Sequence, residues 1–293
     1  MNTNSIFLIV AALIPALSLL IFIFKKDKVE KEPIFLLLLL LASGVIICYP
    51  AAKIERFILD FINICFQPFM KEVDGQIFLS ERTFKVYTAA QNFIGIALVE
   101  EMLKFLVLII FTKKSKNFNC LFDGIVYSVF VSLGFAGFEN ILYVLQYGWG
   151  NALIRALTAV PGHMFFAVIM GYYYSWAHIF EKAKQYEIKW KKDGIIPENI
   201  IEFSAKKYWI CSILIPVLAH GFYDYCCSMD TLFATIAFYV FIIILYVLCF
   251  KKVNKMSKAD AVDSTYTIYL LLKKYPQLNE FLFNNIQSYN SCE

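Results

Sequence analysis

The stretch SIFLIVAALIPALSLLIFIF, residues 5–24, decides the fold class of this chain of 293 residues. It carries no charge, and its length is the roughly 20 apolar residues that an α-helix needs to cross the hydrocarbon core of a bilayer. No positive charge precedes the stretch and no small-residue cleavage site follows it, which is unlike a cleaved signal peptide. We therefore expect a retained membrane span at residues 5–24.

The rest of the chain has the same apolar character. Hydrophobic residues make up 60% of the sequence and charged residues 17%, a balance too apolar for one soluble domain of this length. Several further apolar runs reach the length of a span, and no alternating strand pattern competes with them. The sequence thus predicts an all-α, polytopic transmembrane helical bundle with about seven spans. These spans are expected near residues 5–24, 33–50, 88–112, 120–147, 152–180, 208–228 and 231–250.

The parts outside these spans are less regular. Residues 54–70 mix aromatic and charged side chains, which predicts an amphipathic helix at the membrane interface. An eighth crossing there is the less favoured alternative. We expect residues 1–250 to form a membrane-embedded core and the more polar residues 251–293 a small cytosolic tail.

Lysine-rich connections predict the orientation of the chain. They occur at residues 25–31, 113–116, 182–207 and 251–258, and segments of this kind face the cytoplasm. Seven spans then place the N-terminus outside and the C-terminus inside the cell membrane, although the loop 51–87 carries basic residues on the outer side. The net charge of +4 reflects these blocks, so nucleic-acid binding is not expected. The eight cysteines contain no CxxC pair and indicate neither a disulfide framework nor a zinc–thiolate site.

Several polar side chains occupy the interior of the spans, where an ionisable group costs roughly 2.5–3.5 kcal/mol at the helix centre. They are Glu100, Glu101, Lys104, Glu139, Asn140, Arg155, His163, His220 and Asp224. At a rise of about 1.5 Å per residue, Glu100 and His163 lie about 17–18 Å from the starts of their spans, and Glu139 and His220 about 12 Å from the outer ends of theirs. We therefore expect these groups to meet in one layer around a hydrated cavity.

The spacing of the polar residues predicts which of them face one another. Glu100 and Lys104 are four residues apart and share a helix face, whereas Glu101 is turned by about 100° from Glu100. One glutamate can then serve chemistry while the other is paired. His220 and Asp224 share a face by the same spacing, so the carboxylate can orient the imidazole or bind a ligand beside it.

Two further patterns concern the fourth and fifth spans. Small residues recur at every fourth position of the fourth span and predict the close approach of another helix. They are Gly124, Ser128, Ser132 and Ala136. In the fifth span, His163 follows Pro161-Gly162, a pair that interrupts the helical hydrogen-bond ladder and can open the backbone beside a cavity.

Each polar feature also has a purely structural explanation. Glu100 and Lys104 could form an ion pair that only orients the helix, Glu139 could reach the membrane interface, and a single buried histidine often hydrogen-bonds a neighbouring helix. Taken together, two imidazoles and several carboxylates at one depth are the groups with which a hydrolytic site binds and activates water.

Four motifs, in this order, resemble the PrsW family of intramembrane proteases, distant relatives of the type II CAAX prenyl endopeptidases. The motifs are Glu100-Glu101-x-x-Lys104, Phe135-x-x-x-Glu139-Asn140, Arg155 with Pro161-x-His163, and His220-x-x-x-Asp224. The resemblance implies site-1-type hydrolysis of peptide bonds in single-span membrane proteins, such as anti-sigma factors, during regulated signalling. Prenylated substrates are a weaker alternative, because the CAAX enzymes have Arg one residue after the position of Lys104 and His in place of Glu139.

For the mechanism we expect Glu100 to activate water, with Glu101 and Lys104 as its support. His163 and His220 are the expected metal ligands, assisted by Glu139 or Asp224, and zinc is the candidate metal. A competing scheme uses no metal: Glu100 and a histidine act as general base, and Asn140 or Arg155 stabilises the oxyanion. The candidate catalytic residues are Glu100, Glu101, Glu139, His163 and His220, and the candidate supporting residues are Lys104, Asn140, Arg155 and Asp224.

A transporter or proton-coupled channel could use the same buried residues as a relay. No internal inverted repeat of the kind seen in many transporters is evident, and the polar groups are expected in one layer and not along a path across the membrane. A catalytically inactive membrane scaffold is a third alternative, and the intact polar set disfavours it.

Overall fold

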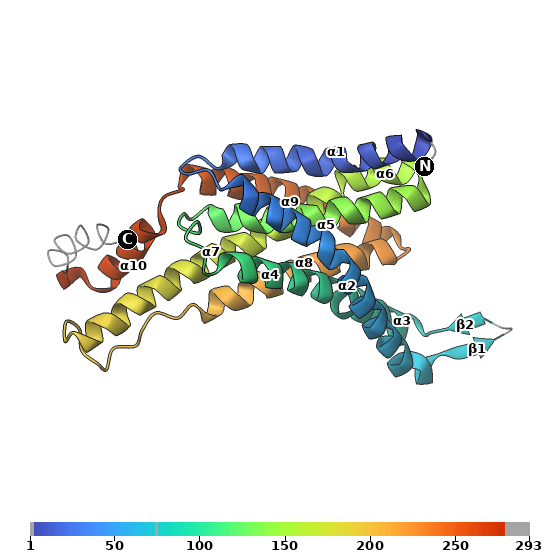
Figure 1. The fold of residues 1–293 in the computed structure, drawn as a ribbon. Coiled ribbons are helices and arrows are strands. Elements are labelled where there is room, and N and C mark those ends of the chain that lie inside the picture. The colour runs from blue at the N-terminus through green and yellow to red at the C-terminus, as the bar shows by residue number, and fades with distance from the viewer. Residues whose placement is uncertain (1–2, 74–75, 279–293) are drawn as a thin grey trace.

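The computed structural model describes residues 3–73 and 76–278, which are almost entirely helical. The α-helices are α1 (Thr3–Lys26), α2 (Ile34–Phe66), α3 (Glu81–Ala89), α4 (Leu98–Thr112), α5 (Asp123–Tyr147), α6 (Trp149–Leu157), α7 (Ala159–Lys192), α8 (Lys206–Ser228), α9 (Leu232–Lys258) and α10 (Asp263–Lys274). A short antiparallel hairpin, β1 (Lys71–Val73) and β2 (Gln76–Phe78), follows the 3₁₀ turn Gln67–Phe69 and projects from one end of the bundle (Figure 1). A second 3₁₀ turn, Pro276–Leu278, follows α10.

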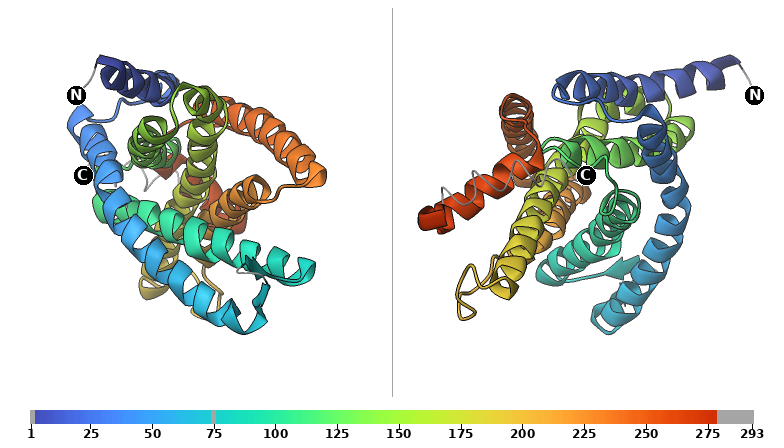
Figure 2. Two further views of the ribbon diagram at one scale, coloured as in Figure 1. Left: turned by 90° about the vertical axis from the view of Figure 1, so that its right-hand side faces the viewer. Right: turned by 60° about the vertical axis from the view of Figure 1, so that its left-hand side comes forward.

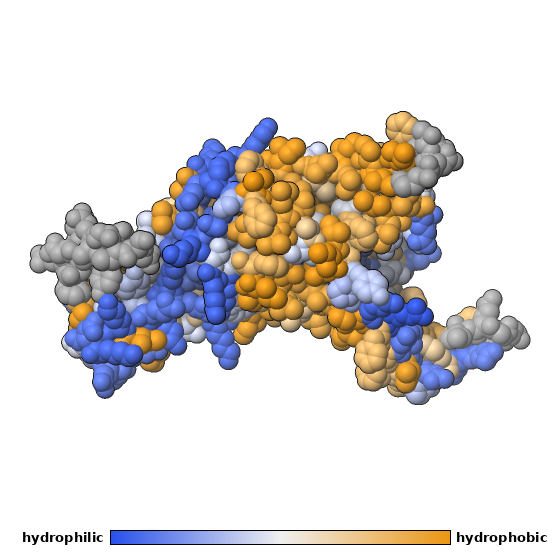
Figure 3. Space-filling model, viewed as in Figure 1, coloured by the Kyte–Doolittle hydropathy of each residue, from blue (hydrophilic) through white to orange (hydrophobic). Residues whose placement is uncertain are grey.

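Six of these helical segments are long and apolar enough to cross a membrane, and they include α1, α2, α5, α7, α8 and α9. Residues 81–112, where the third span was expected, form a further long helical run in which α3 and α4 are joined by a π-helical segment, Ala90–Ala97. Figure 3 shows the matching surface, with a hydrophobic band across the middle of the molecule and hydrophilic residues gathered at the end that contains α10. The predicted class, an all-α polytopic helical bundle, is confirmed, and six of the expected spans meet the length and polarity of a membrane-crossing helix.

The second span is longer than predicted. The sequence suggested an end near residue 50 and a separate interfacial helix at 54–70, but α2 runs without a break from Ile34 to Phe66. Pro50 lies inside α2 and does not end it, because neighbouring helices can support a proline in a membrane helix. This continuity carries Glu55 along the same helix into the wall of the bundle.

The fifth span is two helices instead of one. The break lies at Thr158, where φ is −123° and ψ is −66°, and it separates the short α6 from α7. Pro161 and Gly162 were expected to cause the irregularity, but they lie in the first turn of α7. A proline is accommodated in a first turn because the N–H that it lacks would have no intrahelical acceptor there.

The core of the bundle is α5 packed against α7, with α1, α2, α8 and α9 placed around them (Figures 1 and 2). Close packing depends on the small residues predicted from the sequence. A Cβ on Gly171 of α7 would lie 2.2 Å from the carbonyl oxygen of Gly124 on α5. Ser128 and Ser132 donate hydrogen bonds to the backbone oxygens of Ala167 (2.8 Å) and His163 (2.9 Å). These contacts fix the rotation of α7, and therefore the direction of the His163 side chain.

At the lysine-rich end, α7 extends beyond the bundle and turns at Gly194, which has a φ of +68°. The described residues 195–205 contain no helix and return toward the bundle as an irregular segment. Buried Glu187 holds that segment by accepting from the backbone N–H of Phe203. This irregular segment is therefore held in place by side-chain contacts.

The C-terminal segment also packs against α7. Leu271 and Tyr275 form a small hydrophobic cluster with Ala183, Trp190 and Ile196. A bridge between Cys120 and Val262 attaches the chain that precedes α10 to the start of α5. Residues 251–278 thus continue α9 to Lys258 and then pack against the lysine-rich end of α7.

A buried acidic residue at this end predicts a pH dependence of stability. Asp27, just after α1, is fully buried, and neither of its carboxylate oxygens has a hydrogen-bond partner among the described residues. Burial raises its pKa to about 6, while Asp260 and Glu30 add to the effect and Lys31 opposes it. Because the folded state holds this proton more tightly than the unfolded state, stability is lost as the pH rises from about 4 to about 6.

We expect Asp27→Asn to remove this pH-dependent loss of folding stability, which amounts to roughly 3 kcal/mol at most. The thermal unfolding midpoint in detergent, measured at pH 4 and at pH 7, should fall less for Asp27→Asn than for the natural protein. Asp60→Asn, which changes an exposed carboxylate of α2, is the control and should keep the natural pH dependence. An identical pH dependence of Asp27→Asn and the natural protein would show that Asp27 is not the responsible group.

Candidate active site

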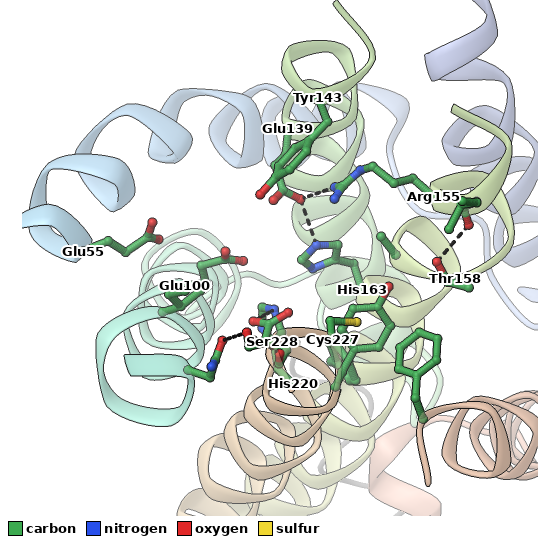
Figure 4. Close-up of a pocket in the computed structure, with 18 residues that line it drawn as sticks. Glu55, Glu100, Glu139, Tyr143, Arg155, Thr158, His163, His220, Cys227 and Ser228 are labelled. Carbon is green, nitrogen blue, oxygen red and sulfur yellow. Dashed lines mark hydrogen bonds and ion pairs between the residues drawn. The ribbon is translucent and has the colours of Figure 1, made fainter. Parts of the chain in front are cut away.

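The polar residues predicted from the sequence gather around one cavity of about 480 Å³, drawn in Figure 4. Six of them line it: Glu100, Glu139, Arg155, His163, His220 and Asp224. Glu101, Lys104 and Asn140 are almost fully buried and contact these lining residues from behind. The expected convergence of the third, fourth, fifth and sixth spans is therefore observed, and α2 adds a further wall.

The α4 part of the site is held by one lysine. The Lys104 Nζ lies 2.8 Å from Glu100 Oε2 and 2.9 Å from Glu101 Oε1, and only 1% of its side chain is exposed. It also lies 3.2 Å from His163 Nδ1. An ammonium group between two adjacent carboxylates offsets their mutual repulsion and draws both toward the same point, although the helix directs them about 100° apart. Both glutamates are thus paired with Lys104.

The opposite side of His163 is held by the ends of α5 and α6. Its Nε2 lies 3.1 Å from Glu139 Oε2, and the same oxygen accepts from Arg155 Nη2 at 2.8 Å. Arg155 Nε donates to Asn140 Oδ1 at 3.0 Å, and Asn140 Nδ2 donates to the backbone oxygen of Ala12 at 2.9 Å. Glu139 therefore points into the bundle and does not reach for the interface. The break at Thr158 lets α6 turn so that Arg155 can close this side.

His220 makes a corresponding pair of contacts from α8. Its Nδ1 lies 3.0 Å from Glu101 Oε1, and its Nε2 lies 3.3 Å from Asp224 Oδ2. The ring stacks on Phe166 with 4.9 Å between centroids and meets the His163 ring at 5.1 Å. Each imidazole thus has one nitrogen toward the α4 group and one toward an outer carboxylate.

Four of these residues could hold a metal ion. Glu100, Glu101, His163 and His220 each offer one ligand atom within 4.8 Å of the other three, and all four residues are buried. Among the described residues, Glu101 Oε2 is buried without a hydrogen-bond partner. Two imidazole nitrogens and carboxylate oxygens form a donor set that Zn²⁺ accepts, so the residues fit the expected metal. The carboxylates in this group are Glu100 and Glu101, whereas Glu139 and Asp224 contact the outer ring nitrogens.

Glu55, which lines the cavity from α2, was not among the residues predicted from the sequence. It was assigned to an interfacial helix because the second span was ended at residue 50. A usable signal was present: Cys48, Ala51 and Glu55 follow a helical spacing across Pro50, and Cys48 and Ala51 are buried on that face. Asn92, Tyr143 and Tyr223 also line the cavity without having been predicted.

Comparison with known proteins identifies a family for this chain. The model of the PrsW family of intramembrane metalloproteases matches residues 32–250. Protease PrsW of Geobacillus kaustophilus (strain HTA426) is 33% identical over 218 residues, which are 74% of this chain and 78% of that protein. Protease PrsW of Clostridioides difficile (strain 630) is 30% identical over 254 residues, 85% of this chain and 90% of that protein.

Protease PrsW of Bacillus subtilis (strain 168) is 30% identical over 218 residues, 74% of this chain and 81% of that protein. No solved structure matches the chain significantly. The matched residues 32–250 contain every ionisable side chain of the cavity. The family model and these relatives show that the chain belongs to the PrsW family of intramembrane metalloproteases.

Proposed function

We propose that the protein cuts single-span membrane proteins within the bilayer, as a site-1-type step in signalling such as the cleavage of an anti-sigma factor. The observation that carries this proposal is the buried group of two glutamates and two histidines beside a cavity large enough to admit a peptide segment and water. Hydrolysis inside a membrane needs ionisable groups and a space that water can enter, and both occur here at one point.

Glu100 is the proposed general base. It lines the cavity with 5% of its surface exposed, and its Oε2 accepts from Lys104. Its Oε1 has no hydrogen-bond partner among the described residues and is available to take a proton from a water in the cavity. General bases act over such hydrogen-bond distances, so the attacking water would sit between Glu100 and the scissile carbonyl.

His163 and His220 are the proposed metal ligands, and the unpartnered oxygen of Glu101 makes it the preferred third ligand. The outer nitrogens then donate to Glu139 and Asp224, which would fix the tautomer and the ring orientation. A zinc ion bound there would supply a Lewis acid that polarises the scissile carbonyl and makes water more acidic.

Arg155 is the proposed oxyanion donor of the metal-free scheme. Asn140 is less suited to that role, because its amide already donates to Ala12 and accepts from Arg155. Arg155 lines the cavity and carries more N–H donors than its contacts with Glu139 and Asn140 use. In that scheme Glu100 and His163 would share the proton of the attacking water.

We further propose that the cavity opens toward the outer face of the cell membrane, with the N-terminus outside. Tyr143, Cys227 and Ser228 line the cavity and belong to the last turns of α5 and α8, at the ends opposite to the lysine-rich connections. Lysine-rich ends face the cytoplasm. The cut would therefore fall in the outer half of the substrate's span.

A substrate-trapping experiment tests this function. Full-length Glu100→Gln should bind its substrate without cutting it, because a glutamine cannot take up the proton of water. We expect proteins that copurify with Glu100→Gln from host membranes to be intact single-span proteins, and the same proteins to be shortened in cells that express the natural chain. Enrichment of multispan proteins only, or an equal amount of each protein with both forms, would contradict the proposal.

A further inference from the structure

Glu55 differs from the other acidic residues of the cavity in having no partner. Figure 4 shows its carboxylate directed from α2 into the same space as Glu100. Among the described residues, Glu100 is paired with Lys104, Glu139 with Arg155 and Asp224 with His220, but Glu55 makes no hydrogen bond or ion pair. The site already described therefore does not use this carboxylate.

The basic residues of α2 do not neutralise Glu55. Lys53 is exposed and lies over the ring of Tyr49, with 5.5 Å between Nζ and the ring centroid. Arg56 is exposed as well. The charged groups nearest to it within the cavity include Glu100 and Glu139, so a cation placed beside Glu55 would be attracted by several carboxylates at once.

The balance of charges around the cavity also favours a cation beside Glu55. Five carboxylates lie around the cavity with only two permanent cations, so acidic side chains outnumber basic ones. The carboxylates are Glu55, Glu100, Glu101, Glu139 and Asp224, and the cations are Lys104 and Arg155. Among the described residues, Glu55 is the one of these carboxylates without a partner.

We propose that Glu55 binds a basic side chain of the substrate, so that the cavity selects proteins with Lys or Arg close to the bond that is cut. This inference rests on the proposed function, because it names the substrate class of the same site. A lysine or arginine head group suits the position: its chain can lie along apolar helix surface while its charge meets a carboxylate shielded from bulk water. A neutral residue there would leave Glu55 uncompensated, and an acidic one would be repelled.

The test measures peptide binding to full-length Glu100→Gln in detergent, so that no peptide is cut. The probes are synthetic single-span peptides in which Lys, Gln or Glu is placed in turn at successive positions along the outer half of the span. At one or more positions we expect the Lys peptide to bind at least about tenfold more tightly than the Gln peptide, and the Glu peptide more weakly still. Adding Glu55→Gln should abolish the preference, and adding Glu55→Lys should reverse it toward the Glu peptide.

Asp60→Asn is the matched control, because Asp60 is an exposed carboxylate of the same helix, and it should leave the preference intact. The inference is overturned if no position favours Lys, or if the preference survives Glu55→Gln. It is also overturned if Glu55→Gln weakens the Lys, Gln and Glu peptides equally, since that result indicates a structural role.

Cleavage by the protein with natural Glu100 separates this inference from the proposed function. If Lys peptides bind selectively but remain uncut, the proposed function fails and the role of Glu55 stands. If peptides are cut without regard to a basic residue, the role of Glu55 fails alone.

Discussion

Replacing Glu100 by Gln is expected to lower the rate of peptide-bond hydrolysis by about 10²–10⁴-fold, the range typical for loss of a general base. The amide has nearly the shape of the carboxylate and can still contact Lys104, so the helix packing around Lys104 should persist. It cannot accept the proton of the attacking water. The loss should therefore appear in kcat, whereas the affinity for substrate should change little.

The measurement is the cleavage of a single-span model protein by purified full-length chain in detergent, followed by mass spectrometry of the products. Asp60→Asn serves as the control, because it removes a carboxylate that is exposed and does not line the cavity. An unchanged thermal unfolding midpoint of Glu100→Gln would show that folding is retained. If folded Glu100→Gln cuts at the natural rate, Glu100 is not the base.

Removal of the metal is the second change expected to have a large effect. Chelation should reduce cleavage by about 10³-fold or more, and added Zn²⁺ should restore it, because the carbonyl would lose its Lewis acid. Substituting Asn for His220 should lower the zinc content of the purified protein, since His220 offers one of four converging ligand atoms. Zinc content measured by elemental analysis is independent of activity and tests the ligand assignment directly.

Two results would favour the metal-free scheme over the metal scheme. One is full activity after chelation, with no metal detected in the protein. The other is a His220→Asn variant that keeps its zinc. In the metal-free scheme Arg155→Gln should lower the cleavage rate more than chelation does, because Arg155 would then be the main donor to the oxyanion.

The fold class could be predicted from the sequence because a bilayer imposes a simple rule on length and polarity. Each long apolar run became a helix, including residues 5–24 and the run that became α9. The helix boundaries were harder to predict from the sequence. Pro50 does not end α2, and the break before α7 lies at Thr158, because packing against neighbouring helices determines whether an interrupted hydrogen-bond ladder is supported.

The π-helical segment Ala90–Ala97 could not be predicted either. Hydropathy is the same for an α-helix and a π-helix, so the sequence pattern does not report the change in hydrogen-bond register. The segment changes the rotation of residues 81–89 relative to Glu100 and contributes Asn92 and Ile96 to the cavity wall. A count of residues from Thr88 therefore does not describe the surroundings of Glu100.

The polar residues of the site were identified because each is costly in a membrane, but most of their contacts were not. The pairing of Glu100 with Lys104 followed from their spacing on one helix. The contact of Lys104 with His163 and that of His220 with Glu101 join different helices, whose relative rotation one sequence does not specify. Glu55 was missed for the related reason that its helix was ended too early.

The central claim is that Glu100, His163 and His220 form a site that hydrolyses a peptide bond inside the membrane. The most direct test is to run the cleavage of the single-span protein in liposomes containing the purified chain and in water enriched in ¹⁸O. We predict a cut in the outer half of the span, with one ¹⁸O atom in each new C-terminal carboxylate, and cleavage about 10²–10⁴-fold slower with Glu100→Gln. A substrate that stays intact with the natural chain, or one cut only outside its span, would contradict the account.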